Sequence, residues 1–271
     1  MAKNKYPQQP KEEGGMGIRL KSQIIPKNFA QEQYLESLRN SPITIANGPA
    51  GSGKTFVVTG VALEKLLSGQ VDRIVFTRPV VEAEEELGFL PGTLEQKLDP
   101  YLKPLFDAVQ DHVGPTAAKK ILEGGRIEIA PLAYMRGRTF NRSYVVLDEA
   151  QNCTVKQMKM FLTRIGERSF YSVNGDITQS DLKIPRDVHK DNWEHGLDYA
   201  IRKLAGRTPD IQYIEFYNQD VVRSKLCKTV VDLLDSPDTK GVHTDNKNQS
   251  KPKRHSFSEP ALFDSSNAEV N

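Results

Sequence analysis

The sequence predicts an α/β fold in which a mostly parallel β-sheet is flanked by helices. Short apolar runs alternate along the chain with longer segments whose apolar residues recur at helical spacing, and this alternation favours βαβ units. Tyr144–Leu147 is continuous and apolar with β-branched residues, as expected of a strand buried on both faces. A chain of 271 residues is long enough to bury a sizeable core.

Six segments have the features of strands, being short, apolar and rich in Ile, Val and Tyr. The predicted strands are Ile43–Ala46, Arg73–Thr77, Ile127–Ala130, Tyr144–Leu147, Phe170–Val173 and Ile211–Tyr217. Longer segments with apolar residues at helical spacing lie between and after them. The predicted helices are Lys54–Leu67, Leu94–Val113, Thr116–Leu122, Val155–Ile165, Trp193–Leu204 and Val221–Leu234.

Both ends of the chain are polar and without periodicity. We expect residues 1–17 to be a flexible arm, residues 18–235 to form one domain, and residues 236–271 to be a disordered polar tail. The net charge of +2 divides into +4 within residues 1–27, 0 within the tail and −2 between them. Any nucleic acid would therefore bind concentrated basic sites and not a uniformly basic body.

Composition excludes several classes of protein. Cys153 and Cys227 are too few for a disulfide framework, which predicts a reducing, cytoplasmic setting. The five histidines are scattered and no Cys/His cluster has zinc spacing. The apolar runs are too short to span a bilayer, and the N-terminal residues lack the apolar stretch of a secretory signal. We therefore expect no membrane association.

A phosphate-binding loop is predicted where the first strand meets the first helix. The segment Gly48-Pro-Ala-Gly-Ser-Gly-Lys-Thr55 matches G-x-x-x-x-G-K-[ST] in the required context. Its glycines let backbone N–H groups face phosphate oxygens, and the helix N-terminus favours an anion. Lys54 is expected to bridge the β- and γ-phosphates of ATP, and the Thr55 hydroxyl to ligate Mg²⁺. The predicted nucleotide-binding residues are Gly48, Pro49, Ala50, Gly51, Ser52, Gly53, Lys54 and Thr55.

Two acidic residues follow the strand Tyr144–Leu147, at the edge of the sheet where ligands of α/β proteins bind. Asp148 is placed to hold Mg²⁺ through water, and Glu149 to act as the base that polarises the attacking water. An Asp-Glu pair after a strand is often only the start of a helix. In a chain with a phosphate-binding loop, the catalytic interpretation is the stronger one.

A third polar strand end is Val173-Asn-Gly-Asp-Ile-Thr-Gln-Ser-Asp-Leu182. A polar residue here can sense the γ-phosphate, and Gln179 can orient water or report the nucleotide state. Turn formation accounts equally well for Asn174, Asp176 and Gln179.

Together these segments resemble the PhoH family of P-loop ATPases, and the resemblance covers about residues 28–235. Further segments that resemble the family are Thr77-Arg-Pro-Val-Val-Glu-Ala83, Leu87-Gly-Phe-Leu-Pro-Gly92, Asp99-Pro-Tyr-Leu-Lys-Pro-Leu-Phe-Asp107, Ile127-Glu-Ile-Ala-Pro-Leu-Ala-Tyr-Met-Arg-Gly-Arg-Thr139, Asp148-Glu-Ala-Gln-Asn152, Gln157-Met-Lys-Met-Phe-Leu-Thr-Arg164 and Asp220-Val-Val-Arg223.

The resemblance implies a RecA-like core, related to the ATPase half of superfamily 1 helicases, with the sheet order 5-1-4-3-2. The strands numbered one to five are then those at 43–46, 74–77, 144–147, 170–173 and 211–216. The resemblance also implies an oligomeric ring, such as a hexamer, that acts on single-stranded RNA or DNA. It places an adenine-reading glutamine at Gln31, with Gln33 as an alternative.

The chain departs from the family pattern at two places. Glu84 stands where members usually have glycine, and the stretch between Leu182 and His195 is longer than usual. Some cellular members carry an N-terminal nucleic-acid-binding region or a PIN ribonuclease domain. We expect neither here, because the chain has room for neither, and nuclease activity is not implied. A stand-alone core of this kind looks like the versions found in bacteriophages, which would act in the host cytoplasm.

Arginines in these motifs are candidates for reading charge on a transferring phosphoryl group. Arg136 or Arg138 is expected to contact a neighbouring subunit or nucleic acid, and Arg223 to sense the γ-phosphate in the same chain. A structural salt bridge or an exposed charge is the alternative for each of them.

The leading functional hypothesis is a Mg²⁺-dependent ATPase that remodels nucleic acid. A small-molecule kinase is the second hypothesis, which the adjacent Asp148 and Glu149 disfavour because they suit attack by water. A nucleotide-gated interaction module with little turnover is the third, and the presence of Glu149 argues against it.

Overall fold

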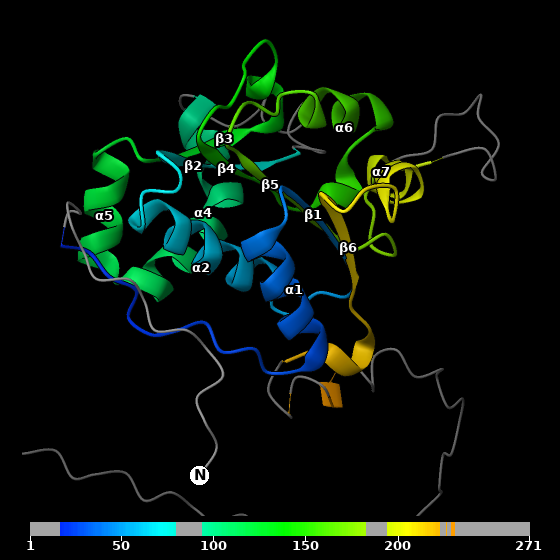
Figure 1. Cartoon of the computed structure of the whole chain (residues 1–271), viewed down its shortest axis with the longest axis horizontal. Coiled ribbons are helices and arrows are strands. Elements are labelled where there is room, and N and C mark those ends of the chain that lie inside the picture. Colours follow the sequence, from blue (N-terminus) through cyan, green and yellow to red (C-terminus); the bar gives the residue numbers. More distant parts are fainter. Residues whose placement is uncertain (1–16, 80–93, 183–193, 223–225, 227–228, 231–271) are drawn as a thin grey trace, which may run out of the picture. The chain divides into compact units, whose positions relative to one another are not determined.

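The computed structural model describes residues 17–79, 94–182 and 194–222, together with residues 226, 229 and 230 (Figure 1). Of residues 94–102 it describes the helical backbone and not the side chains. Contacts divide the chain into two units, Met1–Ser224 and Lys225–Asn271, and the elements below lie in the first. Within the described ranges, no helix is both long and apolar enough to cross a membrane.

The centre of the fold is a six-stranded sheet in which all neighbouring strands are parallel. The strands are β1 (Ile43–Asn47), β2 (Arg73–Arg78), β3 (Ile127–Pro131), β4 (Ser143–Leu147), β5 (Phe170–Gly175) and β6 (Ile211–Glu215). Their order is β3-β2-β4-β5-β1-β6. The predicted order 5-1-4-3-2 is confirmed, because it corresponds to β6-β1-β5-β4-β2. The short strand β3 extends the sheet beyond β2.

Burial along the strands follows their position in the sheet. Every residue of β4 is buried, because β4 lies between β2 and β5 and helices cover both of its faces. The residues of the edge strand β6 are all partly exposed. The continuous apolar run of β4 and the alternation of β6 are the patterns that distinguish a central strand from an edge strand.

Helices cover both faces of the sheet and form two separate cores (Figure 1). On one face lie α1 (Phe29–Asn40), α2 (Lys54–Leu67), α4 (Leu94–Val113) and α5 (Pro115–Glu123). On the other lie η1 (Leu132–Met135), α6 (Val155–Leu162) and α7 (Gly196–Leu204). Side chains of the strands alternate between the two cores: Val146 joins the first, and Val145 and Leu147 join the second. This three-layer arrangement confirms the RecA-like α/β fold.

Helix α1 was not among the predicted helices. Its sequence is largely polar, and only part of one face is buried, so its apolar periodicity is weak. The local signal is Asn28, whose side chain accepts a hydrogen bond from the Gln31 N–H and caps the helix N-terminus.

Three predicted helices have different ends in the structure. The helix predicted over 155–165 ends at Leu162, because the chain then turns and the Arg164 carbonyl accepts from the Phe140 N–H. The helix predicted from Trp193 begins at Gly196 after His195, which is extended; Trp193 lies outside the described residues. The helix predicted from Val221 is wrong at its start, because Val221 and Val222 follow the 3₁₀ turn η4 (Asn218–Asp220) and are not helical. Of residues 223–234, only 226, 229 and 230 are described, as helical.

The contact between α4 and α2 depends on a buried histidine. The His112 Nε2–H donates to the Phe56 carbonyl over 2.8 Å, and the two rings lie 4.2 Å apart. Gly60 makes room, since a Cβ there would lie 2.7 Å from the His112 ring. Burial lowers the pKa of His112, against the weaker opposing effects of the Phe56 carbonyl, Asp111 and Glu64.

The lowered pKa predicts a loss of stability in acid. In the unfolded state His112 binds a proton near the ordinary histidine pKa of about 6.5, whereas in the folded state it binds one only at lower pH. The stabilising contribution of neutral, buried His112 is therefore present above the unfolded pKa and is lost as the pH falls through the folded pKa. We expect the free energy of unfolding to decline less between neutral and mildly acidic pH in His112→Gln than in the wild type, measured by urea denaturation. Equal pH dependence in both proteins would contradict this role of His112.

Candidate nucleotide site

The predicted phosphate-binding loop lies between β1 and α2, at the carboxyl edge of the sheet. Two glycines in it are required by local geometry. Gly48 has a φ of 140°, and a Cβ there would collide with the Phe216 carbonyl. Gly53 adopts the left-handed conformation, with a φ of 87°, immediately before α2 begins. The carbonyl of Gly51 accepts from the Val222 N–H, so the segment after β6 is fixed against the loop.

Lys54 is turned toward its own loop. Its ammonium donates to the Gly48 carbonyl, to the Pro49 carbonyl over 3.1 Å and to the Ser52 hydroxyl over 3.2 Å. Burial lowers the pKa of Lys54, and the carboxylates of Asp176, Asp148 and Glu149 oppose that effect. Lys54 therefore faces acidic groups from two neighbouring strand ends.

Asp148 joins three parts of the site. Its carboxylate accepts from the Thr55 hydroxyl over 3.2 Å and from the Arg78 guanidinium, whose Nη2 lies 2.7 Å from Oδ2. The Asp148 side chain is only 5% exposed. The oxygens of Thr55 and Asp148 lie side by side and are hard ligands of the kind that Mg²⁺ prefers, so these residues fit a magnesium site.

Glu149 lies beside Asp148 but in a different environment. Its backbone is left-handed, with a φ of 55°, a conformation that is uncommon for a residue other than glycine. Its side chain is 49% exposed, accepts from the Gln151 amide over 2.8 Å and lies 3.9 Å from the Arg78 guanidinium. A half-exposed carboxylate next to the phosphate-binding loop is suited to accept a proton from water.

A buried polar network lies at the end of β5. The Tyr34 hydroxyl donates to the Asn174 side-chain oxygen over 2.6 Å, and the Ser172 hydroxyl donates to the same oxygen. Asp176 caps the following turn by accepting from the Thr178 N–H and hydroxyl. Asp176 thus makes the contacts that turn formation predicts, whereas Asn174 lies within β5 and bonds to Tyr34 and Ser172 instead of forming a turn. Gln179 is exposed in the loop after β5.

Gln31 is buried against the phosphate-binding loop. Its Nε2 donates to the Ser52 carbonyl over 2.8 Å, and its Oε1 accepts from the Lys27 N–H over 2.9 Å. Both ends of its amide therefore bond to backbone and connect α1 to the loop. Gln33, the alternative, is exposed. The assignment of Gln31 to adenine stays a prediction.

The candidate arginines fall into different environments. Arg138 forms a two-pronged ion pair with Glu128 on β3, and its guanidinium lies 4.6 Å from the centre of the Phe140 ring. Arg136 is exposed on the loop after η1. Arg223 lies outside the described residues. Sequence reasoning considered Arg78 only as one of the arginines in the family motifs, without a specific partner, and it assigned no role to Gln151.

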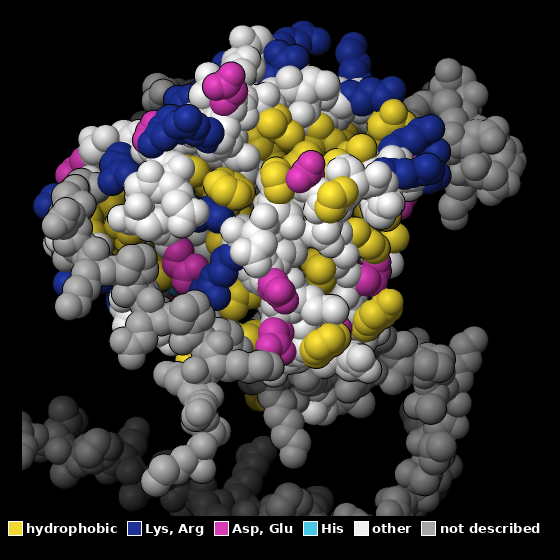
Figure 2. All heavy atoms as spheres, in the orientation of Figure 1, with side chains coloured by type: hydrophobic (Ala, Val, Ile, Leu, Met, Phe, Trp, Pro, Cys, Tyr) yellow, Lys and Arg dark blue, Asp and Glu magenta, His cyan; other side chains and the backbone are white. Residues whose placement is uncertain are grey.

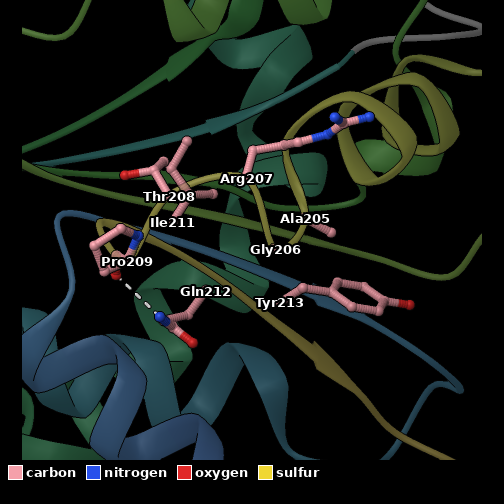
Figure 3. A pocket seen from close by; sticks show the side chains of 8 residues that line it. All are labelled: Ala205, Gly206, Arg207, Thr208, Pro209, Ile211, Gln212 and Tyr213. Atoms are coloured by element: carbon pink, nitrogen blue, oxygen red, sulfur yellow. Dashed lines mark hydrogen bonds between the residues drawn. The ribbon is translucent and has the colours of Figure 1, made fainter.

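A separate hollow of about 500 Å³ is lined by the segment that connects α7 to β6 and by the first residues of β6 (Figure 3). Its lining includes Arg207, Pro209 and Tyr213, and among the lining residues the Gln212 amide donates to the Pro209 carbonyl over 2.9 Å. This hollow is at the amino end of β6, whereas the phosphate-binding loop lies at the carboxyl ends of the strands. It is therefore not part of the candidate nucleotide site.

Known proteins resemble this chain over most of its length. The family described as PhoH-like protein matches residues 23–235. The chain is 48% identical over 209 residues to a PhoH-like protein of Mycobacterium tuberculosis (strain ATCC 25618 / H37Rv), and the match covers 77% of this chain and 57% of the relative. It is 45% identical over 212 residues to a PhoH-like protein of Bacillus subtilis (strain 168), and this match covers 78% of this chain and 64% of the relative. The chain thus matches about three-fifths of the length of these relatives.

Among solved structures, the chain is similar to the large terminase of a thermophilic bacteriophage. The sequence identity is 13% and the TM-score 0.44, over 79% of this chain and 51% of that one. The likeness concerns the fold alone.

The arginine environments predict different effects on stability. Arg138→Ala loses the Glu128 pair and the Phe140 contact, and we expect it to lower the free energy of unfolding by about 1 kcal/mol. Arg136→Ala removes an exposed side chain and should change the free energy of unfolding by less than about 0.5 kcal/mol. Urea denaturation of both variants distinguishes them, and equal stability would contradict the structural role of Arg138.

Proposed function

The chain belongs to the PhoH-like protein family, and we propose that it is a Mg²⁺-dependent ATPase whose turnover is coupled to single-stranded RNA or DNA in an oligomeric ring. The observation that carries the ATPase part is the convergence of four side chains at one edge of the sheet. Lys54 and Thr55 come from the start of α2, and Asp148 and Glu149 from the end of β4. The Thr55 hydroxyl contacts the Asp148 carboxylate at 3.2 Å, which joins the two halves of the site.

In the proposed reaction, backbone N–H groups of the loop and the Lys54 ammonium bind the phosphates of ATP. Thr55 and Asp148 would hold Mg²⁺, which neutralises charge on the phosphate oxygens when bound. The Glu149 carboxylate accepts a proton from the attacking water, whose oxygen bonds to the γ-phosphorus as the bond to ADP breaks. Arg223 is proposed to sense the γ-phosphate, and Gln179 to orient the water.

The nucleic-acid part of the proposal rests on a concentrated basic surface. Figure 2 shows Lys and Arg side chains gathered over the loop after β3 and over α6. Exposed cations on these elements include Arg136, Lys156 and Lys159, and Tyr134 on η1 has a half-exposed ring. Exposed cations together with an exposed aromatic ring suit a single-stranded backbone and its bases. Because Arg138 is held by Glu128, Arg136 is the better placed of the two to contact another molecule.

The ATPase proposal predicts phosphate release from ATP and Mg²⁺ without an added acceptor. Glu149→Gln removes the base but keeps the size of the side chain, so we expect release to fall about 100-fold or more while nucleotide still binds. A malachite-green assay of both proteins, with fluorescence titration of a labelled nucleotide, measures this. Absence of release from the wild type would contradict the ATPase, and release only with a small-molecule acceptor would indicate a kinase.

The nucleic-acid proposal predicts an effect of Arg136 that depends on salt. Loss of one phosphate contact should weaken binding of a single-stranded oligoribonucleotide and reduce the slope of log Kd against log salt concentration by about 0.7. Fluorescence anisotropy of Arg136→Ala tests this. Lys119→Ala, on the exposed side of α5, is the control and should leave the slope unchanged. Equal slopes for the wild type and Arg136→Ala would remove Arg136 from the surface.

A further inference from the structure

We propose that Gln151 is a positioning residue that fixes the Glu149 carboxylate and makes its orientation follow the loop after β5. This inference rests on the proposed function, in which Glu149 accepts a proton from water. It assigns a role to a side chain that contacts neither phosphate nor metal in that proposal. Gln151 can have this role because one end of its amide bonds to Glu149, which follows β4, and the other end bonds to Asp176, which follows β5.

The direction of both hydrogen bonds is determined by chemistry. A backbone N–H can only donate, so the Gln151 atom 3.1 Å from the Asp176 nitrogen must be its carbonyl oxygen. The other end is then the NH₂ group, which donates to the Glu149 carboxylate over 2.8 Å. The Gln151 residue is only 4% exposed, so water does not readily replace these partners.

The sequence leaves space for this connection. Gly175 is the last residue of β5, and a Cβ there would lie 2.7 Å from the Gln151 side-chain oxygen and 3.0 Å from its backbone nitrogen. Any larger residue would therefore push Gln151 away from the Asp176 N–H. The glycine between Asn174 and Asp176 is explained by this close approach, without a left-handed backbone.

Two more pairs of residues hold the turn after β4 against the loop after β5. The Gln151 carbonyl accepts from the Ser180 hydroxyl over 3.0 Å, and Ser180 also contacts His195 at the start of α7. The Asn152 and Asp181 residues exchange two hydrogen bonds, at 3.0 Å and 2.8 Å. The loop after β5, which also carries Gln179, is thus joined to the turn after β4 at several points.

Glu149 needs such a partner because its surroundings constrain it weakly. Half of its side chain is exposed, and the Arg78 guanidinium lies 3.9 Å away and bonds closely to Asp148 instead. The Gln151 amide, at 2.8 Å, is therefore the closer of these two partners of the Glu149 carboxylate. A displacement of the loop after β5 would move Asp176, then Gln151, and so rotate the carboxylate that accepts the proton.

The test compares three variants of the full chain with the wild type. Gln151→Met keeps the approximate size and removes both hydrogen bonds. Gln151→Glu keeps the acceptor for the Asp176 N–H but replaces the donor to Glu149 with a like charge. Gln212→Met removes the amide hydrogen bond to the Pro209 carbonyl, outside the candidate nucleotide site, and is the matched control. For each variant we would measure the melting temperature, the affinity for a fluorescent ATP analogue with Mg²⁺, and the single-turnover rate of hydrolysis.

If Gln151 positions Glu149, hydrolysis should slow at least about tenfold in both Gln151 variants, with affinity within about twofold of the wild type. Gln212→Met should hydrolyse within about twofold of the wild-type rate. A purely structural role would lower the melting temperature and leave the rate of the folded protein unchanged. Gln151→Glu keeps the test decisive if Gln151→Met does not fold.

Two results would overturn the inference in distinguishable ways. Wild-type hydrolysis in folded Gln151→Glu, or a loss confined to nucleotide affinity, would remove Gln151 from the positioning role and leave the proposed ATPase intact. Failure of the wild type itself to hydrolyse ATP would refute the proposed function, and the role of Gln151 would fall with it.

Discussion

A buried carboxylate must be paired, and in this fold the pairing of Asp148 determines how the site is assembled. Removing an ionised side chain from water is costly unless charged or hydrogen-bonding partners compensate. Asp148 receives the Thr55 hydroxyl from the helix after the phosphate-binding loop and the Arg78 guanidinium from β2. Three elements that are distant in sequence are thereby held together at one acidic group.

The parallel sheet is what makes this meeting possible. When all strands run in the same direction, their carboxyl ends share one edge, and the residue after each strand projects there. In the register of β2 and β4, Thr77 lies opposite Leu147, which places the following residues, Arg78 and Asp148, beside each other. On the other side, β5 ends at Gly175, next to the turn that holds Gln151. The site is therefore a consequence of strand order more than of any single loop.

The strands and the local motifs were predicted from short-range patterns in the sequence, whereas the order of the strands was implied by the resemblance to the PhoH family. The phosphate-binding loop and the Asp148–Glu149 pair could be recognised from spacing and from the strands that precede them. Helix α1 could not, because its apolar stripe is narrow and its main signal is one capping residue, Asn28. The contacts of Arg78 and Gln151 were also not predicted, since they depend on the register of neighbouring strands, which the order of the strands does not determine. The different environments of the two arginines were likewise visible only in the structure, where Arg138 is paired with Glu128 and Arg136 is exposed.

The central claim is that Thr55 and Asp148 form a magnesium site next to nucleotide phosphates. The most direct measurement is a crystal structure of the full chain with a non-hydrolysable ATP analogue and Mn²⁺, with anomalous scattering to locate the metal. We expect the anomalous peak close to the Thr55 hydroxyl and to Asp148, next to the β- and γ-phosphates. We also expect the Lys54 side chain to have turned from its own loop to those phosphates. A nucleotide bound elsewhere, or a metal peak remote from Thr55 and Asp148, would contradict the claim.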